Sequence, residues 1–126
     1  MCPIDCKIDH EERLVHAKAW GDVFLDDILK YFDAVSIGDA AHYRKLFDAL
    51  EMVPRLSDDD FMIVAACVSA YAVYDPRGPI AAVATSQPAL FALQRYANFA
   101  GGEDRPLRLF PSVAEARAWL DGLPRT

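Results

Sequence analysis

The sequence predicts an α/β fold with a mixed sheet of four or five strands, about four helices and an N-terminal β-hairpin. Short segments with strand patterning alternate with longer segments whose apolar residues recur at helical spacing. The first two strand-like segments follow each other directly, which is typical of a hairpin. The 126 residues are the size of one domain, so we expect a single domain over residues 1–126.

The predicted hairpin rests on two segments in which apolar and polar side chains alternate with a period of two, as in strands with one buried face. The apolar positions are Ile4, Cys6 and Ile8 in the first segment and Val15, Ala17 and Ala19 in the second. A polar turn at residues 9–12 separates the two segments, and Gly21 is expected to end the second strand.

The first helix is predicted after residue 22, where apolar residues recur at helical spacing and acidic residues occupy the other side. The apolar positions are Phe24, Ile28, Tyr31, Phe32 and Val35. Residues 46–50 are then expected to form a third strand, although Leu and Ala in this segment also suit a helix.

A long helix is predicted from Ser57, the expected N-cap, to about Tyr74, with three aspartates near the positive end of the helix dipole. Its apolar residues go all the way round, so the helix is either buried on two sides or shared with a partner. We therefore expect a homodimer through this helix. The residues expected at the interface are Met62, Ala66, Val68 and Val73.

The C-terminal half continues the alternation of strands and helices. Residues 79–85 form a continuous apolar run of the kind that central parallel strands show. A third helix opens at Ser86, and residues 107–110 are expected to form the last strand. A capping box at residues 112–115 begins the last helix, which Gly122 ends. This order predicts a largely parallel sheet with right-handed crossovers.

Composition excludes several classes of function. Thirteen Lys and Arg against nineteen Asp and Glu give a formal charge of −6 and a pI near 4.9, so nucleic acid and anionic membranes are poor partners. The apolar segment at residues 61–74 is too short for a bilayer, and no membrane insertion is expected. The N-terminus lacks a secretory signal, and the cysteines are the odd set Cys2, Cys6 and Cys67. We therefore expect a cytoplasmic protein with free thiols.

Catalytic and cofactor motifs are absent from the sequence, which has no G-x-S-x-G elbow, phosphate-binding glycine loop or C-x-x-C spacing. Asp48 and residues 58–60 could gather at a strand end and hold Mg²⁺, but solvated helix-cap charges are the favoured interpretation. Cys67, in the middle of an apolar helix, is interpreted as a small buried hydrophobe. We expect no catalytic residues, no metal and no cofactor.

Several segments together resemble the SpoIIAA-like proteins, a bacterial family grouped with STAS domains and, more distantly, with SEC14-type lipid carriers. They are the hairpin ending in Trp20-Gly21, the strand at 46–50, the helix start Leu56-Ser57-Asp58, the strand at 80–84, the Arg95-Tyr96 pair and the closing segment 110–120. The closing pattern F-x-S-x-x-E-A-x-x-W-L is the most specific of these. The resemblance covers nearly the whole chain and implies a SpoIIAA-like fold.

The resemblance also implies candidate site residues. Anti-sigma factor antagonists with this fold carry a phosphorylated serine at the start of the helix after the third strand. Here Asp58 or Asp59 takes that position, and Ser57 remains as a regulatory hydroxyl or a plain N-cap. Arg95 matches a family arginine and is expected to face an anionic ligand or a partner's carboxylate. The alternatives are a helix-surface arginine or an internal salt bridge to Asp48 or Asp75. The expected binding residues are Ser57, Asp58, Phe61, Arg95 and Tyr96.

The function predicted from these observations is that of a small non-enzymatic regulatory module that binds a protein partner. The alternative is a carrier or sensor of a small hydrophobic or lipid-like ligand, and an unrecognised enzyme ranks third. A partner-binding module should show an exposed apolar or acidic patch around residues 57–61, whereas a carrier should show an enclosed apolar pocket.

Overall fold

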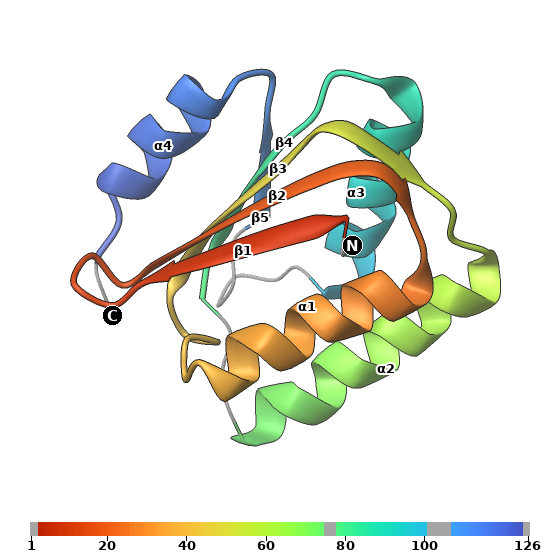
Figure 1. Cartoon of the computed structure of the whole chain (residues 1–126), viewed down its shortest axis with the longest axis horizontal. Helices are drawn as coiled ribbons and strands as arrows, with labels where there is room; N and C mark the ends of the chain where they lie inside the picture. The colour runs from red at the N-terminus through yellow and green to blue at the C-terminus, as the bar shows by residue number, and fades with distance from the viewer. Residues whose placement is uncertain (1–2, 75–77, 101–106, 125–126) are drawn as a thin grey trace.

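A computed structural model describes residues 3–74, 78–100 and 107–124, with side chains described for residues 3–70, 78–98 and 107–124 (Figure 1). Within these ranges five strands and four helices follow one another along the chain. They are β1 (Ile4–Asp9), β2 (Leu14–Val23), α1 (Leu25–Ile37), β3 (Arg44–Pro54), α2 (Asp58–Tyr74), β4 (Ile80–Val83), α3 (Gln87–Ala100), β5 (Leu107–Phe110) and α4 (Val113–Asp121).

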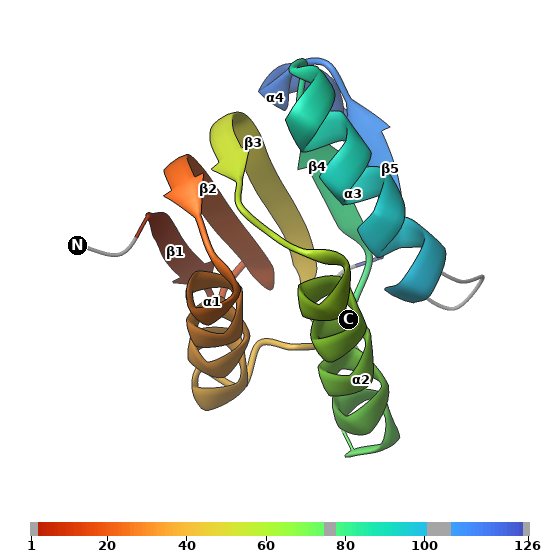
Figure 2. The ribbon, with the colours of Figure 1, turned by 90° about the vertical axis from the view of Figure 1, so that its right-hand side faces the viewer.

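The strands form one mixed sheet in the order β1-β2-β3-β4-β5. β1 is antiparallel to β2, and the other neighbours are parallel, which confirms the predicted hairpin and mixed sheet. Right-handed crossovers between successive parallel strands place the connecting helices on one face of the sheet. Accordingly α1, α2 and α3 share one face, whereas α4 covers the other (Figures 1 and 2).

The sheet core consists of a layer on each face. The faces predicted for β2 are confirmed, because Val15, Ala17 and Ala19 are fully buried in the main core under α1, α2 and α3. Leu14 points the other way and packs with Leu120 of α4 in a smaller cluster. Alternation along a single strand thus supplies both layers.

Gly21 was expected to end the second strand, and this prediction is wrong. β2 continues to Val23, and its pairing with β3 shifts by one residue between Lys18 and Trp20. Gly21 has a φ of +69°, a conformation that costs glycine little and that suits an irregular strand. A glycine in a strand can therefore mark a local irregularity instead of an end.

Phe24 was expected on the buried face of the first helix, but its side chain is 54% exposed. It precedes α1 as the N-cap residue, and its amide donates to the Asp27 carboxylate at 2.8 Å. The other predicted positions behave as expected: Tyr31, Phe32 and Val35 are buried against the sheet.

The helix α2 packs against α1 and α3, beneath the middle of the sheet (Figure 2). Its inner side chains are buried, but Met62 and Ile63 are 65% and 44% exposed and Ala66 is also exposed. The helix is thus buried on one side only. Val68 was expected at the dimer interface, but its side chain is 1% exposed and belongs to the main core. The side chain of Val73 lies outside the described residues.

None of the described helices combines the length and hydropathy of a transmembrane span.

Candidate functional site

The start of α2 is closed by a reciprocal pair of hydrogen bonds. The Ser57 hydroxyl accepts from the Asp60 amide at 3.1 Å, and the Asp60 carboxylate accepts from the Ser57 amide at 2.9 Å. This is a capping box with Asp in the third helical position. The interpretation of Ser57 as an N-cap is confirmed, and its hydroxyl already serves the helix end.

Arg95 of α3 meets the first turn of α2. Its Nη1 donates to the Asp58 carboxylate at 2.5 Å, and its guanidinium lies 4.5 Å from the centre of the Phe61 ring. The guanidinium is also 5.9 Å from the ring centre of Phe91, one turn earlier in α3. The fold therefore brings together Asp58, Phe61 and Arg95, which the sequence predicted as binding residues.

The internal partner of Arg95 differs from both expected carboxylates. Asp48 is 7% exposed on β3, and its carboxylate accepts from the Leu50 amide at 3.1 Å. Asp75 lies outside the described residues. Asp58 is the partner because α2 and α3 pack side by side, a contact that sequence spacing does not reveal.

Exposed apolar side chains flank this ion pair. Met62 follows Asp58 by one helical turn and Phe91 precedes Arg95 by one turn, so each shares a helix face with a member of the pair. The two side chains are 65% and 66% exposed. We call Asp58, Met62, Phe91 and Arg95 the α2–α3 patch.

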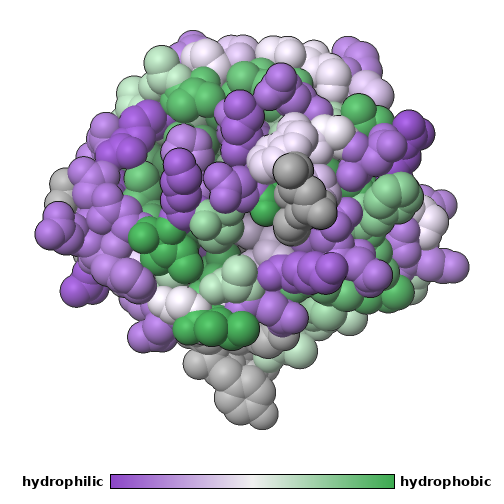
Figure 3. All heavy atoms as spheres, in the orientation of Figure 1, coloured by the Kyte–Doolittle hydropathy of each residue, from purple (hydrophilic) through white to green (hydrophobic). Residues whose placement is uncertain are grey.

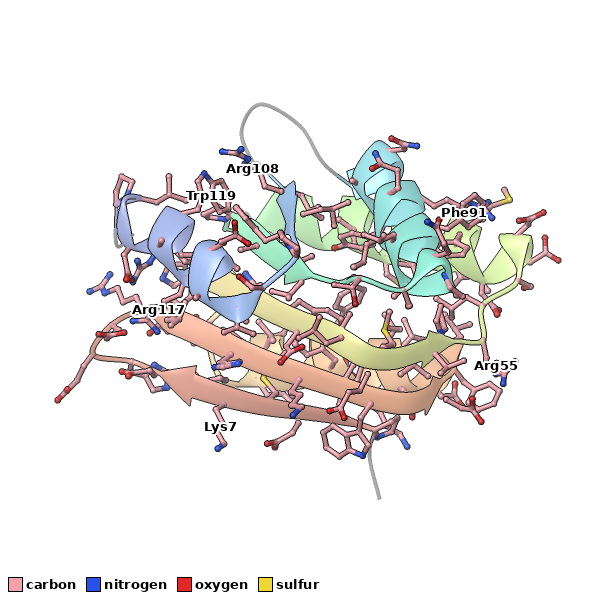
Figure 4. The ribbon with its side chains drawn as sticks, turned by 90° about the horizontal axis from the view of Figure 1, so that it is seen from above. Lys7, Arg55, Phe91, Arg108, Arg117 and Trp119 are labelled. Carbon is pink, nitrogen blue, oxygen red and sulfur yellow. The ribbon has the colours of Figure 1, made fainter. Side chains whose placement is uncertain are left out.

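The patch has a definite place on the molecule. Figure 4 shows Phe91 on α3 at the same end of the molecule as Arg55, opposite the end that carries Arg117 and Trp119.

On the face seen in Figure 3, hydrophobic residues form small separate areas among hydrophilic ones. Phe91 is an aromatic residue of the apolar segment at the start of α3, and its exposure shows that it is not part of the core.

An apolar cavity of about 80 Å³ lies between the sheet and the three helices on its main face. Its lining comes from α1, β3, α2, β4, α3 and β5 and from Leu56, between β3 and α2. The lining residues are Ile28, Tyr31, Phe32, Lys45, Phe47, Met52, Leu56, Phe61, Val64, Ile80, Ala92, Leu93, Tyr96 and Leu107. Tyr96, expected as a binding residue, thus faces the cavity, and Phe61 both lines the cavity and stacks with Arg95.

Lys45 contributes the charged group of the cavity lining, and the sequence analysis missed it. The side chain is 2% exposed, and its ammonium donates to the carbonyl oxygens of Tyr43, at 2.9 Å, and Ala41. One signal was available in the sequence: Lys45 lies two residues before Phe47, so a strand directs both side chains to the same face.

Arg44, the neighbour of Lys45, points to the opposite face of the sheet and is also 2% exposed. Its guanidinium donates to the carbonyl oxygens of Leu120 at 2.7 Å and Glu12 at 2.8 Å, which ties α4 to the hairpin turn. Its Nε is buried with no hydrogen-bond partner among the described residues. Arg44 therefore has a structural role between two elements.

Metal-ligating side chains do not converge in the described part of the chain, where no three His, Cys, Asp or Glu residues are grouped to hold an ion. Cys6 and Cys67 are free and half-buried, and Cys2 lies outside the described residues. Burial raises the pKa of the Cys6 thiol above its ordinary value of 9.0; the negative charge of Asp5 adds to this and Lys45 opposes it. Cys6 is therefore a weakly reactive thiol at neutral pH.

Comparison with known proteins identifies the fold. No family model and no curated protein matches the sequence. Among solved structures, the chain is similar to an uncharacterised protein of the DUF3478 family with a SpoIIAA-like fold from Shewanella loihica PV-4. The TM-score is 0.65 at 16% identity, over 95% of each chain. It is also similar to an anti-sigma factor antagonist from Mycobacterium paratuberculosis, with a TM-score of 0.56 at 13% identity over 94% of each chain.

These similarities establish the architecture: the chain has a SpoIIAA-like α/β fold, as its sequence predicted. Because both identities are low, they identify the fold alone.

Proposed function

We propose that this chain is a small non-enzymatic regulatory module that binds a protein partner through the α2–α3 patch. The observation that carries the proposal is the exposure of Met62 and Phe91, at 65% and 66%, on either side of the Asp58–Arg95 pair. Large exposed apolar side chains next to charged groups are typical of interaction surfaces.

The chemistry of the patch supports a protein partner. Aromatic residues, methionine and arginine are enriched in protein interfaces, and the patch contains one of each. Arg95 has a side chain that is 27% exposed, so its guanidinium can still donate to a partner's acceptor beside Asp58. Acidic side chains at the start of α2 would steer a basic surface toward the patch. The similarity in fold to an anti-sigma factor antagonist adds support for a regulatory role.

The proposal can be tested by site-specific photocrosslinking in the source cells. A benzophenone amino acid is placed at Met62 or Phe91, and crosslinked partners are identified by mass spectrometry. Ile37 is the matched control site, because it is an apolar residue that is 86% exposed on α1, outside the patch.

The identified partner is then purified, and its affinity is measured for wild type, Phe91→Ser and Ile37→Ser. Loss of a central aromatic contact should weaken binding by at least about tenfold, as at interface hot spots, whereas Ile37→Ser should bind like wild type. Equal crosslinking from Ile37, or full affinity of Phe91→Ser, would contradict the assignment of the patch.

A further inference from the structure

The side of α2 that faces away from the sheet has no charged residue beyond the first turn of the helix. Among the side chains that the structure describes, the exposed ones there are Met62, Ile63, Ala66, Ser69 and Ala70. They recur at intervals of three or four residues and so form one stripe, which we call the outer α2 stripe. The solvent-facing side of a helix normally carries charged and polar residues, so this stripe has the composition of a contact surface.

The outer α2 stripe lies at the boundary of the molecule. In Figure 2, α2 lies beside α1 at the lower edge, and none of the described elements covers its side away from the sheet. Met62 and Ile63 are 65% and 44% exposed, so one end of the stripe carries large apolar side chains in water. Covering them would gain about 25 cal/mol for each Å² of apolar surface removed from water.

The stripe is arranged symmetrically about Ala66 and fits a second copy of itself. Met62 and Ile63 lie four and three residues before Ala66. Ser69 and Ala70 lie three and four residues after it. In an antiparallel pair of α2 helices with a two-fold axis at Ala66, the large end of each stripe therefore lies over the small end of the other. Such a contact uses the same surface on both copies, and small side chains let the helices approach closely.

Charge also favours contact through the stripe. The chain has a formal net charge of −6, so two copies repel each other wherever their charged surfaces approach. The charged residues of α2 are confined to its first turn, at Asp58–Asp60. The stripe therefore lets two copies meet without like charges at the centre of the contact, and it offers no charged residue that would select a different partner.

The size of the stripe indicates a weak dimer. The 17 residues of α2 make a helix of about 25 Å. A standard stable interface buries about 800 Å² on each partner, and permanent dimers bury more. A contact made mainly by one pair of helices of this length is at the low end of that range, so the dimer is reversible.

We propose that a second copy of this chain covers the outer α2 stripe, in a reversible antiparallel dimer with its two-fold axis at Ala66. Met62 belongs both to the stripe and to the α2–α3 patch, so the dimer covers one of the two exposed apolar side chains of the patch. A partner at the patch therefore competes with the second copy. The competition rests on the proposed function, whereas the dimer does not.

Disulfide formation tests the position of the axis. Identical residues face each other at a two-fold axis, so Ala66→Cys should form a disulfide between copies on air oxidation. Ile37→Cys is the matched control, because Ile37 is 86% exposed on α1. Both variants carry Cys67→Ala, which removes the native thiol next to position 66. Ala66→Cys should give at least about tenfold more disulfide-linked dimer, since the two Cα atoms of a disulfide lie within about 7 Å.

Photocrosslinking in the purified chain tests the orientation. A benzophenone amino acid replaces Met62, and isotope-labelled and unlabelled copies are mixed so that bonds between copies are recognised by mass. The probe should react with Ser69 or Ala70 of the other copy. Sedimentation equilibrium of the wild-type chain, which depends on no variant, should show a monomer–dimer equilibrium at micromolar to millimolar concentrations.

Three results would overturn the inference. The first is a wild-type chain that stays monomeric up to millimolar concentration. The second is an equal yield of disulfide-linked dimer from Ala66→Cys and Ile37→Cys. The third is reaction of the Met62 probe with the first turn of the other copy, which would indicate parallel helices. These results concern copies of this chain alone, so they leave the proposed function in place, and failure to find a different partner in cells would leave the dimer in place.

Discussion

Arg95 and Asp58 form an ion pair between α3 and α2, with Nη1 and Oδ1 2.5 Å apart. The two residues are 37 positions apart in the chain. The Arg95 guanidinium also stacks on the ring of Phe61, which lines the cavity. One arginine thus connects the first turn of α2 with α3.

The Arg95–Asp58 pair should contribute modestly to stability. Its carboxylate is 85% exposed, so a double-mutant cycle with Arg95→Gln and Asp58→Asn should give a coupling of about 0.5 kcal/mol. The coupling energy should be smaller in 1 M salt, because salt screens the interaction between exposed charges. Urea unfolding provides the measurement, and the Arg55–Asp22 pair, exposed by 54% on both sides, is the control. A coupling well above that of the control pair would contradict the prediction that the Arg95–Asp58 pair contributes only modestly.

Ser57→Ala should lower the free energy of unfolding by about 1 kcal/mol, because the Asp60 amide loses its acceptor. Ser57→Asp should change it by less than about 0.5 kcal/mol, since Asp caps helices as well as Ser does. Ser112→Ala, which removes the equivalent cap of α4, serves as the matched substitution in urea unfolding. An unaffected Ser57→Ala would mean that the hydroxyl does not stabilise α2.

A homodimer through the outer face of α2 remains a prediction. If it forms, Ala66→Glu should be folded and monomeric in sedimentation experiments, because Ala66 is exposed. Val68→Asp should unfold the chain instead, since it would bury a charge at a position that is 1% exposed. Ile37→Glu, at another exposed apolar site, should leave the dimer intact. A wild-type chain that sediments as a monomer at all concentrations would contradict the prediction.

Stability should decrease at alkaline pH through Cys6. Because burial raises the pKa of its thiol in the folded chain, the unfolded chain loses this proton first as the pH rises above 9.0. The contribution is fully present below that value and is lost as the pH rises through the higher folded pKa. Urea unfolding should therefore show a steeper alkaline decline for wild type than for Cys6→Ala. Parallel declines would show that the thiol titrates alike in both states.

Local pattern was sufficient to predict most elements. The alternation in β1 and β2, the helical spacing of Tyr31, Phe32 and Val35, and the cap at Ser57 each depend on neighbours within a few residues. The structure confirms these elements, because interactions between near neighbours are enough to specify them. The end of β2 was predicted wrongly because pairing with β3 carries the strand past Gly21, and a strand's partner is not visible in its own pattern.

The candidate sites were predicted less completely. Ser57, Asp58, Phe61 and Arg95 were singled out, but the partner of Arg95 was assigned to other carboxylates because the packing of α2 on α3 was unknown. Lys45 was missed because lysine side chains are usually exposed to solvent. Lys45 is buried because β3 lies inside the sheet with helices packed on both of its faces.

The sequence by itself determined the order of strands and helices along the chain, the buried faces of β2 and α1 and the α/β class, because these depend on local periodicity and end signals. Tertiary structure decided which charges meet, which apolar residues remain exposed on α2 and α3, and where a cavity lies beneath α2. These features depend on how distant elements pack. Packing brings together residues such as Arg95 and Asp58, and their contact cannot be predicted from the local sequence because they are far apart in the chain.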